Sequence, residues 1–194
     1  LVRPGGSGDR AGGVWPPADG AGNPAEPTPL PDDARAVCAK DDRLYWLAPA
    51  GAGWAVQSRA LDGGEAETLA ELPDLAADSS PWADGIYGGV LCFSANDAGQ
   101  TRSYALDFAT NTLNERPTAY AIDGELQPYS ILCGNDNWLF VLTGVERRTV
   151  TSIGDDGALL TYQRGASQIG IMTPADYAAA SLDARPCTRL DAWG

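Results

Sequence analysis

Two segments far apart in the chain share one pattern, and this recurrence restricts the fold more than any other feature. The segment "AVCAKDDRLYWL", residues 36–47, aligns with "ILCGNDNWLFVL", residues 131–142, at an offset of 95 residues. Leu91 of "GIYGGVLCFSAND" lies between them, 47 residues after Leu44 and 48 before Leu139. Short strands recurring with a period in the forties are typical of propeller blades. The recurrence predicts three units, near residues 36–79, 80–127 and 128–182.

The first unit has the clearest strand pattern. Apolar runs separated by Gly, Asp and Asn predict strands at about 35–40, 43–48, 54–61 and 66–71. The run "RLYWLAP" is apolar at consecutive positions, which indicates an inner strand covered on both faces. Asp62-Gly63-Gly64 predicts a hairpin turn because glycine adopts positive φ without strain.

The third unit needs two additions. We expect an extra hairpin in "RRTVTSIGDDGALLTYQRG", turning at Asp155-Asp156-Gly157. The segment "TPADYAAAS" predicts a short helix with Thr173 as its N-cap and Pro174 at its first position. The sequence therefore predicts an all-β chain of about three four-stranded propeller-like blades, forming a partial or open propeller, with one short helix near the C-terminus.

Residues 1–34 differ in composition from the rest. They are dominated by Gly and Pro and contain few apolar residues that could anchor them. We interpret residues 1–34 as a linker or a tail lying on the surface, held by Trp15 and Leu30, and residues 35–194 as a single β-repeat domain. Such tails often separate a domain from a cell envelope, so an extracytoplasmic protein, secreted or attached to the envelope, is expected.

The first unit resembles the YWTD repeat of low-density-lipoprotein-receptor-type propellers, which also occurs in degenerate form in extracytoplasmic bacterial proteins. Leu44-Tyr45-Trp46 match the Tyr-Trp of the repeat, and Leu61-Asp62-Gly63-Gly64 match its Leu-Asp-Gly turn. Leu47-Ala48 stand where the repeat has Thr-Asp, and Phe108 replaces the turn glycine in the second unit. The resemblance implies six blades in a ring, and three units cannot close one. A homodimer that completes the propeller is one solution; the others are an excised part of a longer protein and an open or sandwich-like array.

Charge and composition exclude several function classes. The formal charge is −13, with 26 acidic and 13 basic residues, so binding to nucleic acid or to an anionic membrane surface is not expected. No apolar run is long enough for a membrane span, so direct membrane insertion is not expected. The chain has no histidine, which removes the usual general base and commonest transition-metal ligand.

Four cysteines allow two disulfides, with buried free thiols as the alternative. No Cys-x-x-Cys pair indicates a zinc site. If bridges form, a link between Cys133 and Cys187 is preferred, because it would tie down the end of the chain.

Four aromatic residues near predicted strand starts or loops are candidate ligand-binding residues. Flat rings beside Asn and Asp would suit a sugar or a peptide, although packing at a core or sheet edge is the alternative. Two further aromatic residues, Trp46 and Phe140, are assigned to the core. The four candidates are Trp54, Trp82, Tyr129 and Trp138.

Carboxylates supply two further hypotheses. Asp41, Asp84 and Asp136 occupy similar positions in their units and could form a glycosidase-like pair, but aspartates at strand ends more often form turns. The segments "GNDNW", "SANDAGQ" and "GDDGAL" gather oxygen ligands, so calcium is a candidate ligand, yet none has the spacing of a known calcium loop. We assign no catalytic residue, no cofactor and no metal ligand.

The preferred function is a non-catalytic extracytoplasmic interaction module that presents loops of β repeats to a protein or a glycan. One alternative is a carboxylate-dependent carbohydrate hydrolase. The other is a structural accessory domain that assembles by sheet-edge pairing.

Overall fold

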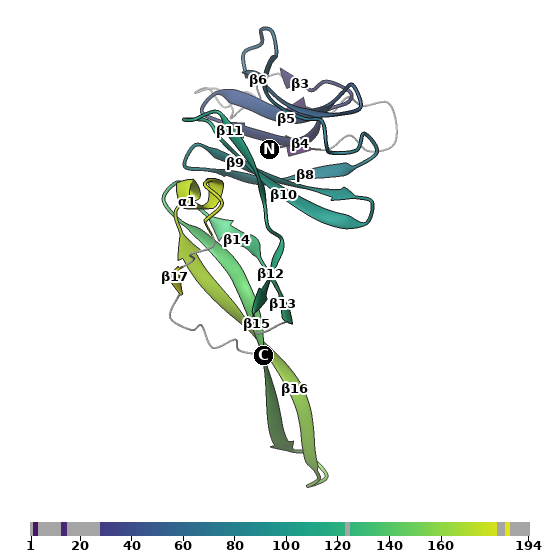
Figure 1. Ribbon diagram of the computed structural model, residues 1–194, viewed down its shortest axis with the longest axis vertical. Helices are drawn as coiled ribbons and strands as arrows, with labels where there is room; N and C mark the ends of the chain where they lie inside the picture. The colour runs from purple at the N-terminus through teal and green to yellow at the C-terminus, as the bar shows by residue number, and fades with distance from the viewer. Residues whose placement is uncertain (1, 4–12, 15–27, 123–124, 182–184, 187–194) are drawn as a thin grey trace, which may run out of the picture.

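The protein is built almost entirely from antiparallel β sheets, as predicted. A computed structural model describes residues 2–3, 13–14, 28–122, 125–181 and 185–186. Within these residues, three four-stranded sheets succeed one another along the chain, and one short helix lies near the C-terminus (Figure 1).

The first two sheets are simple meanders. Neighbours in sequence are neighbours in each sheet, with the orders β4-β5-β6-β7 and β11-β10-β9-β8. The four strands of the first sheet begin and end within two residues of the predicted positions. The first sheet consists of β4 (Arg35–Lys40), β5 (Arg43–Ala50), β6 (Gly53–Ala60) and β7 (Glu67–Leu72). The second consists of β8 (Ser80–Tyr87), β9 (Val90–Asp97), β10 (Gln100–Asp107) and β11 (Thr112–Arg116).

The third sheet is less regular. A small hairpin, β12 (Ala119–Ile122) and β13 (Glu125–Pro128), separates it from the second sheet. Its order is β14-β15-β16-β17, and the helix α1 (Pro174–Ala178) lies between its last two strands in sequence. The strands are β14 (Ser130–Gly134), β15 (Leu139–Ile153), β16 (Leu159–Met172) and β17 (Arg185–Pro186).

The sheets stack face to face in chain order, as propeller blades do. One core cluster joins the first and second sheets and includes Tyr45, Val56, Phe93 and Leu106. Another joins the second sheet, the third sheet and α1. The outer face of the first sheet is covered by the preceding segment, because Leu30 and others pack against Trp46 and its neighbours.

Phe140 corrects one expectation, because it is 36% exposed while Trp46 is 1% exposed. Successive residues of a strand face opposite sides of the sheet. Leu139 and Val141 face the second sheet, so Phe140 faces outward. Tyr45 and Cys92 occupy the corresponding positions in the first and second sheets, and each faces the next sheet along the chain. No further sheet follows the third one within the described residues, so the Phe140 face has no such cover.

The predicted extra hairpin exists, but it continues β15 and β16 instead of forming a separate unit. The two strands pair from Leu139↔Met172 to Ile153↔Leu159, with one irregularity between Leu142 and Gly144. The tip turns where expected: the Gly154 amide donates to the Ala158 carbonyl, and Gly157 has φ +79°. We refer to residues 145–167 as the arm. Figure 1 shows that it projects away from the stacked sheets.

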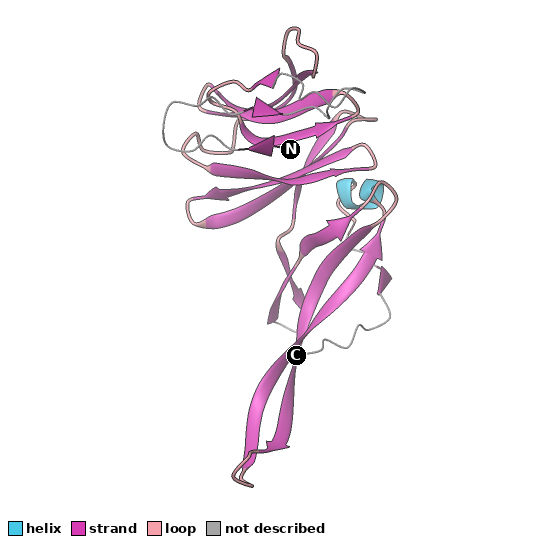
Figure 2. Ribbon diagram, turned by 180° about the vertical axis from the view of Figure 1, so that it is seen from behind, coloured by secondary structure: helices cyan, strands magenta, loops and turns pink. Residues whose placement is uncertain are grey.

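Short strands are also described near the N-terminus, and the predicted helix near the C-terminus is present. Three two-residue strands, β1 (Val2–Arg3), β2 (Gly13–Val14) and β3 (Thr28–Pro29), form a small antiparallel sheet. Thr173 caps α1 as predicted, since its hydroxyl accepts a hydrogen bond from the Asp176 amide at 3.1 Å. Figure 2 shows the helix beside the third sheet, at the end nearest the second. The predicted anchor Trp15 and the cysteine Cys187 lie outside the described residues.

Candidate functional site

Two of the four candidate aromatic residues lie in the core. The Trp54 side chain is buried, and its Nε1 donates to the Ala76 carbonyl at 2.8 Å. Tyr129 is buried too; its hydroxyl donates to the Met172 sulfur at 3.2 Å, and its ring stacks on Tyr177. The structure places both rings where they pack the protein and offer no free face to a ligand.

The other two, Trp82 and Trp138, are each 42% exposed. Trp82 lies in β8, and its Nε1 donates to Asp84 Oδ1 at 3.1 Å. Trp138 ends the β14–β15 turn, where its backbone amide donates to Asn135 Oδ1 at 2.9 Å. Both rings are therefore accessible from solvent, and binding of a sugar or a peptide by them stays a prediction.

Asp84 is a partly buried carboxylate that accepts hydrogen bonds from two side chains. The pairing of β8 and β9 is irregular between Ala83 and Gly85, so Asp84 lies at a β-bulge. The Ser94 hydroxyl donates to Asp84 Oδ2 at 2.7 Å. Burial raises the pKa of Asp84, although the hydrogen bonds from Ser94 and Trp82 oppose the increase.

Asp84 should therefore make stability depend on pH. A carboxyl whose pKa is higher in the folded state binds more protons there than in the unfolded chain. The stability that Asp84 contributes should fall as the pH rises from its unfolded value of 3.8 through its raised folded value. Urea unfolding across this range should show Asp84→Asn gaining stability relative to the wild type as the pH rises. Asp41→Asn controls for the loss of one negative charge, and identical trends for both variants would contradict the assignment.

The other acidic candidates lie in turns between strands. Asp41 lies in the β4–β5 turn with φ +50°. Asp136 forms an ion pair with Lys40 and accepts a hydrogen bond from the Gly88 amide at 3.0 Å. Asn96 and Asp156 likewise accept hydrogen bonds from amides in their own turns. Among the described residues, no three His, Cys, Asp or Glu side chains gather in a way that could hold a metal ion.

The three cysteines that the structure describes, Cys38, Cys92 and Cys133, are free thiols. The proposed bridge from Cys133 ends at a residue outside the described part of the chain. Burial, followed by the nearby charge of Asp84, raises the pKa of Cys38 to about 11. Burial also raises the pKa of Cys92. Because the thiolate is the reactive form, these two thiols are poor nucleophiles near neutral pH.

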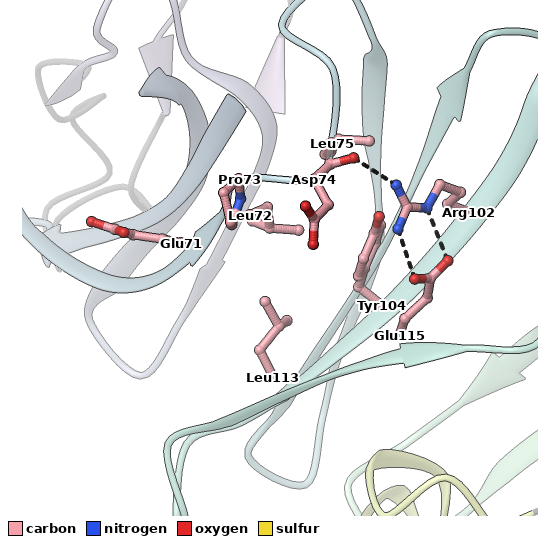
Figure 3. A pocket seen from close by; sticks show the side chains of 9 residues that line it. All are labelled: Glu71, Leu72, Pro73, Asp74, Leu75, Arg102, Tyr104, Leu113 and Glu115. Carbon is pink, nitrogen blue, oxygen red and sulfur yellow. Dashed lines mark hydrogen bonds and ion pairs between the residues drawn. The ribbon is translucent and has the colours of Figure 1, made fainter. Parts of the chain in front are cut away.

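A hollow of about 180 Å³ lies between the first and second sheets, lined by residues of β7, the β7–β8 loop, β10 and β11. Figure 3 shows Arg102 at one side of the hollow, where it binds the Glu115 carboxylate at 2.7 and 2.9 Å and the Asp74 carbonyl at 2.8 Å. Arg102 also contacts Asp97 at 3.3 Å. The Arg102 hydrogen bonds lower the pKa of Glu115. The guanidinium therefore joins the loop to the sheet, and its charge is neutralised by acidic partners.

Among the large apolar side chains of the described residues, the three with the highest exposed fractions lie on the arm. Ile153 is 75% exposed, Leu159 74%, Leu160 51% and Tyr162 47%. The register places Ile153 and Leu159 on one face, and Val150, Leu160 and Tyr162 on the other. The sequence pattern predicted this hairpin but did not identify its apolar residues as a candidate site. The available signal was the presence of four large apolar residues on the two sides of an acidic turn.

The edges of the arm are also open towards its tip, whereas β13 lies against β15 nearer the stacked sheets. Beyond Leu142, β15 pairs only with β16 within the described residues, and β17 pairs with β16 only at Gly170 and Ile171. Natural sheet edges are usually blocked by charged residues, proline or bulges. Residues 149–153 and 159–163 of the two edges contain no charge, no proline and no bulge. An isolated two-stranded hairpin is only marginally stable in water. The arm is such a hairpin, because no third strand pairs with it within the described residues.

Comparisons with known proteins do not identify a relative. No family model, no curated protein and no solved structure matches the chain. Among the described residues, the helix α1 is too short and too polar to cross a bilayer.

Proposed function

We propose that the protein is an interaction module that binds a protein partner through its arm, by sheet-edge pairing together with burial of the apolar tip. The observation that carries the proposal is the exposure of Ile153, Leu159, Leu160 and Tyr162 on a projecting hairpin with open edges. Burying one such side chain contributes about 1.5–3 kcal/mol. Burial of several of them can offset the entropic cost of association, about 4–15 kcal/mol.

Charge supports a protein partner for the arm. The arm has three arginines and three acidic residues, so it carries no net charge, whereas the whole chain has a formal charge of −13. The arm is therefore the part of an acidic protein that another acidic protein can approach without strong repulsion. Backbone hydrogen bonds to a strand edge would supply affinity, and alternate side chains would supply specificity.

Peptide selection tests the proposal directly. A displayed library of random peptides is selected against the wild-type protein and against a variant in which residues 146–166 are replaced by a short Gly-Ser turn. We expect peptides with β-forming, apolar sequences to be enriched on the wild type and lost on the variant. Circular dichroism and thermal unfolding check that the sheets of the variant remain folded. Equal enrichment on a folded variant would overturn the proposal.

The remaining predictions from the sequence continue as proposals. The resemblance to YWTD-type repeats, an extracytoplasmic location and binding of a glycan at the exposed Trp82 and Trp138 are compatible with an interaction module. A homodimer that closes a ring needs the outer face of the first sheet, and Leu30 and Ala34 already pack against that face. The arm offers a route to assembly that leaves this packing in place.

A further inference from the structure

Charges follow a fixed order along the arm. Glu146, Arg147, Arg148 and Arg164 lie near its base, and Asp155 and Asp156 form the turn at the tip. The segments between them, residues 149–154 and 157–163, are uncharged. We propose that the arm pairs with the arm of a second copy of this chain, antiparallel across a twofold axis. The proposal rests on the function proposed above and names the partner of the same site.

Hydrogen bonding in the arm defines which backbone groups are available for this pairing. The Gly154 amide donates to the Ala158 carbonyl, so Gly154 and alternate residues before it direct their amide and carbonyl groups toward β16. Thr149, Thr151 and Ile153 therefore direct theirs toward the open edge of β15. These residues can form a regular antiparallel ladder with the same edge of another copy.

Charge complementarity selects the register of the ladder. If Thr151 lies opposite Thr151 of the second copy, Thr149 lies opposite Ile153, and Arg147 lies beside Asp155. Glu146 then lies beside Asp156, whose carboxylate accepts a hydrogen bond from the Ala158 amide within its own turn. Both Arg147 and Asp155 are exposed, and within the described residues neither has an ion-pair partner. The twofold axis produces this contact twice. A parallel arrangement of the arms would instead place arginines beside arginines and aspartates beside aspartates, which is unfavourable.

The same register gathers the apolar side chains. Residues directly opposite each other in an antiparallel ladder lie on the same face. The face that carries Val150, Leu160 and Tyr162 is therefore continuous across the two arms, in a four-stranded sheet with β15 of each copy at its centre. A sheet of this size no longer has the instability of an isolated hairpin.

Charge reversal at Arg147 and Asp155 tests the pairing in the full-length chain. We expect the wild type to sediment as a dimer in equilibrium with monomer. Arg147→Asp and Asp155→Arg should each weaken the dimer by roughly tenfold or more, since each places two like charges together at both contacts. The double variant restores opposite charges and should dimerise nearly as well as the wild type. An equal exchange at Glu65 and Arg35, which lie outside the arm, is the control and should leave dimerisation unchanged.

A cysteine at the twofold axis tests the register. Directly opposite residues in a hydrogen-bonded antiparallel pair have Cα atoms about 5.5 Å apart, within the range of a disulfide. Thr151→Cys should form a disulfide between the two copies at this position on mild oxidation, and Thr149→Cys should not form the equivalent one. Mass spectrometry distinguishes these bridges from those of the native cysteines.

Three results would overturn the inference: a wild type that is monomeric throughout sedimentation, a double variant that fails to recover, or equal bridging by Thr149→Cys. A monomer whose arm still selects peptides would leave the proposed function standing, so the two proposals can fail separately.

Discussion

Replacing Phe93 with alanine is expected to cost about 3–5 kcal/mol of unfolding free energy, the usual loss for a buried phenylalanine. Phe93 is completely buried between the first two sheets, and its ring stacks on Tyr104 with centroids 5.2 Å apart. Truncation leaves a cavity that two rigid sheets cannot easily close. Domains of this size are typically stable by only about 5–15 kcal/mol, so the variant should lose much of its resistance to urea.

Phe140→Ala is the matched control because it removes the same side chain from a strand of the third sheet. Phe140 is 36% exposed on the outer face of this sheet. Its replacement should cost about 1–2 kcal/mol, clearly less than that of Phe93, because part of its surface is already exposed to solvent. Urea unfolding followed by tryptophan fluorescence measures both variants. Similar losses for Phe93 and Phe140 would mean that the outer face of the third sheet is covered in solution.

The contrast between these two residues shows what the sequence could predict. Alternation and turn residues are local, and they predicted the strands of the first sheet and the turn at Gly157. The pattern also placed Leu44, Leu91 and Leu139 at or near the starts of equivalent strands, and all three are fully buried. Whether Phe140 is buried depends on whether another sheet follows the third. No local sequence pattern predicts that.

The candidate site was harder to predict than the fold. Trp54 and Trp82 both lie near strand starts, yet only Trp82 is exposed. Trp54 is covered by a loop whose Ala76 carbonyl accepts its hydrogen bond from 22 residues away. Tyr129 is covered in the same way by Tyr177 of the helix. Such contacts between distant segments arise only from the way the sheets stack.

The arm, in contrast to these aromatic residues, has a local structure that can be predicted from its own sequence. Its strands, turn and charges can all be found in the sequence between Glu146 and Gln168. The pattern does not reveal that β15 and β16 extend beyond the other strands of their sheet, because the neighbours end early. Exposure of the apolar tip therefore follows from the lengths of β14 and β17, not from the residues of the arm itself.

Gly88→Ala is expected to weaken the contact between the second and third sheets. Among the glycines in the turns between strands, its replacement should have the largest effect on this contact. Gly88 has φ +52°, and a Cβ atom there would lie 2.4 Å from the backbone oxygen of Asp136. The β14–β15 turn would have to move, which weakens the hydrogen bond from the Gly88 amide to Asp136 and the ion pair with Lys40. Overpacking of this kind typically costs about 1–3 kcal/mol, in addition to about 1 kcal/mol for left-handed backbone.

Gly51→Ala isolates the clash from the backbone strain. Gly51 has a similar φ of +59°, but no atom lies within 4 Å of the added Cβ. Its replacement should cost only about 1 kcal/mol, the penalty for the left-handed conformation alone. Urea unfolding compares the two variants, and hydrogen exchange should show faster exchange at residues 134–138 in Gly88→Ala only. Equal costs for the two glycines would show that the third sheet does not rest on the β8–β9 turn.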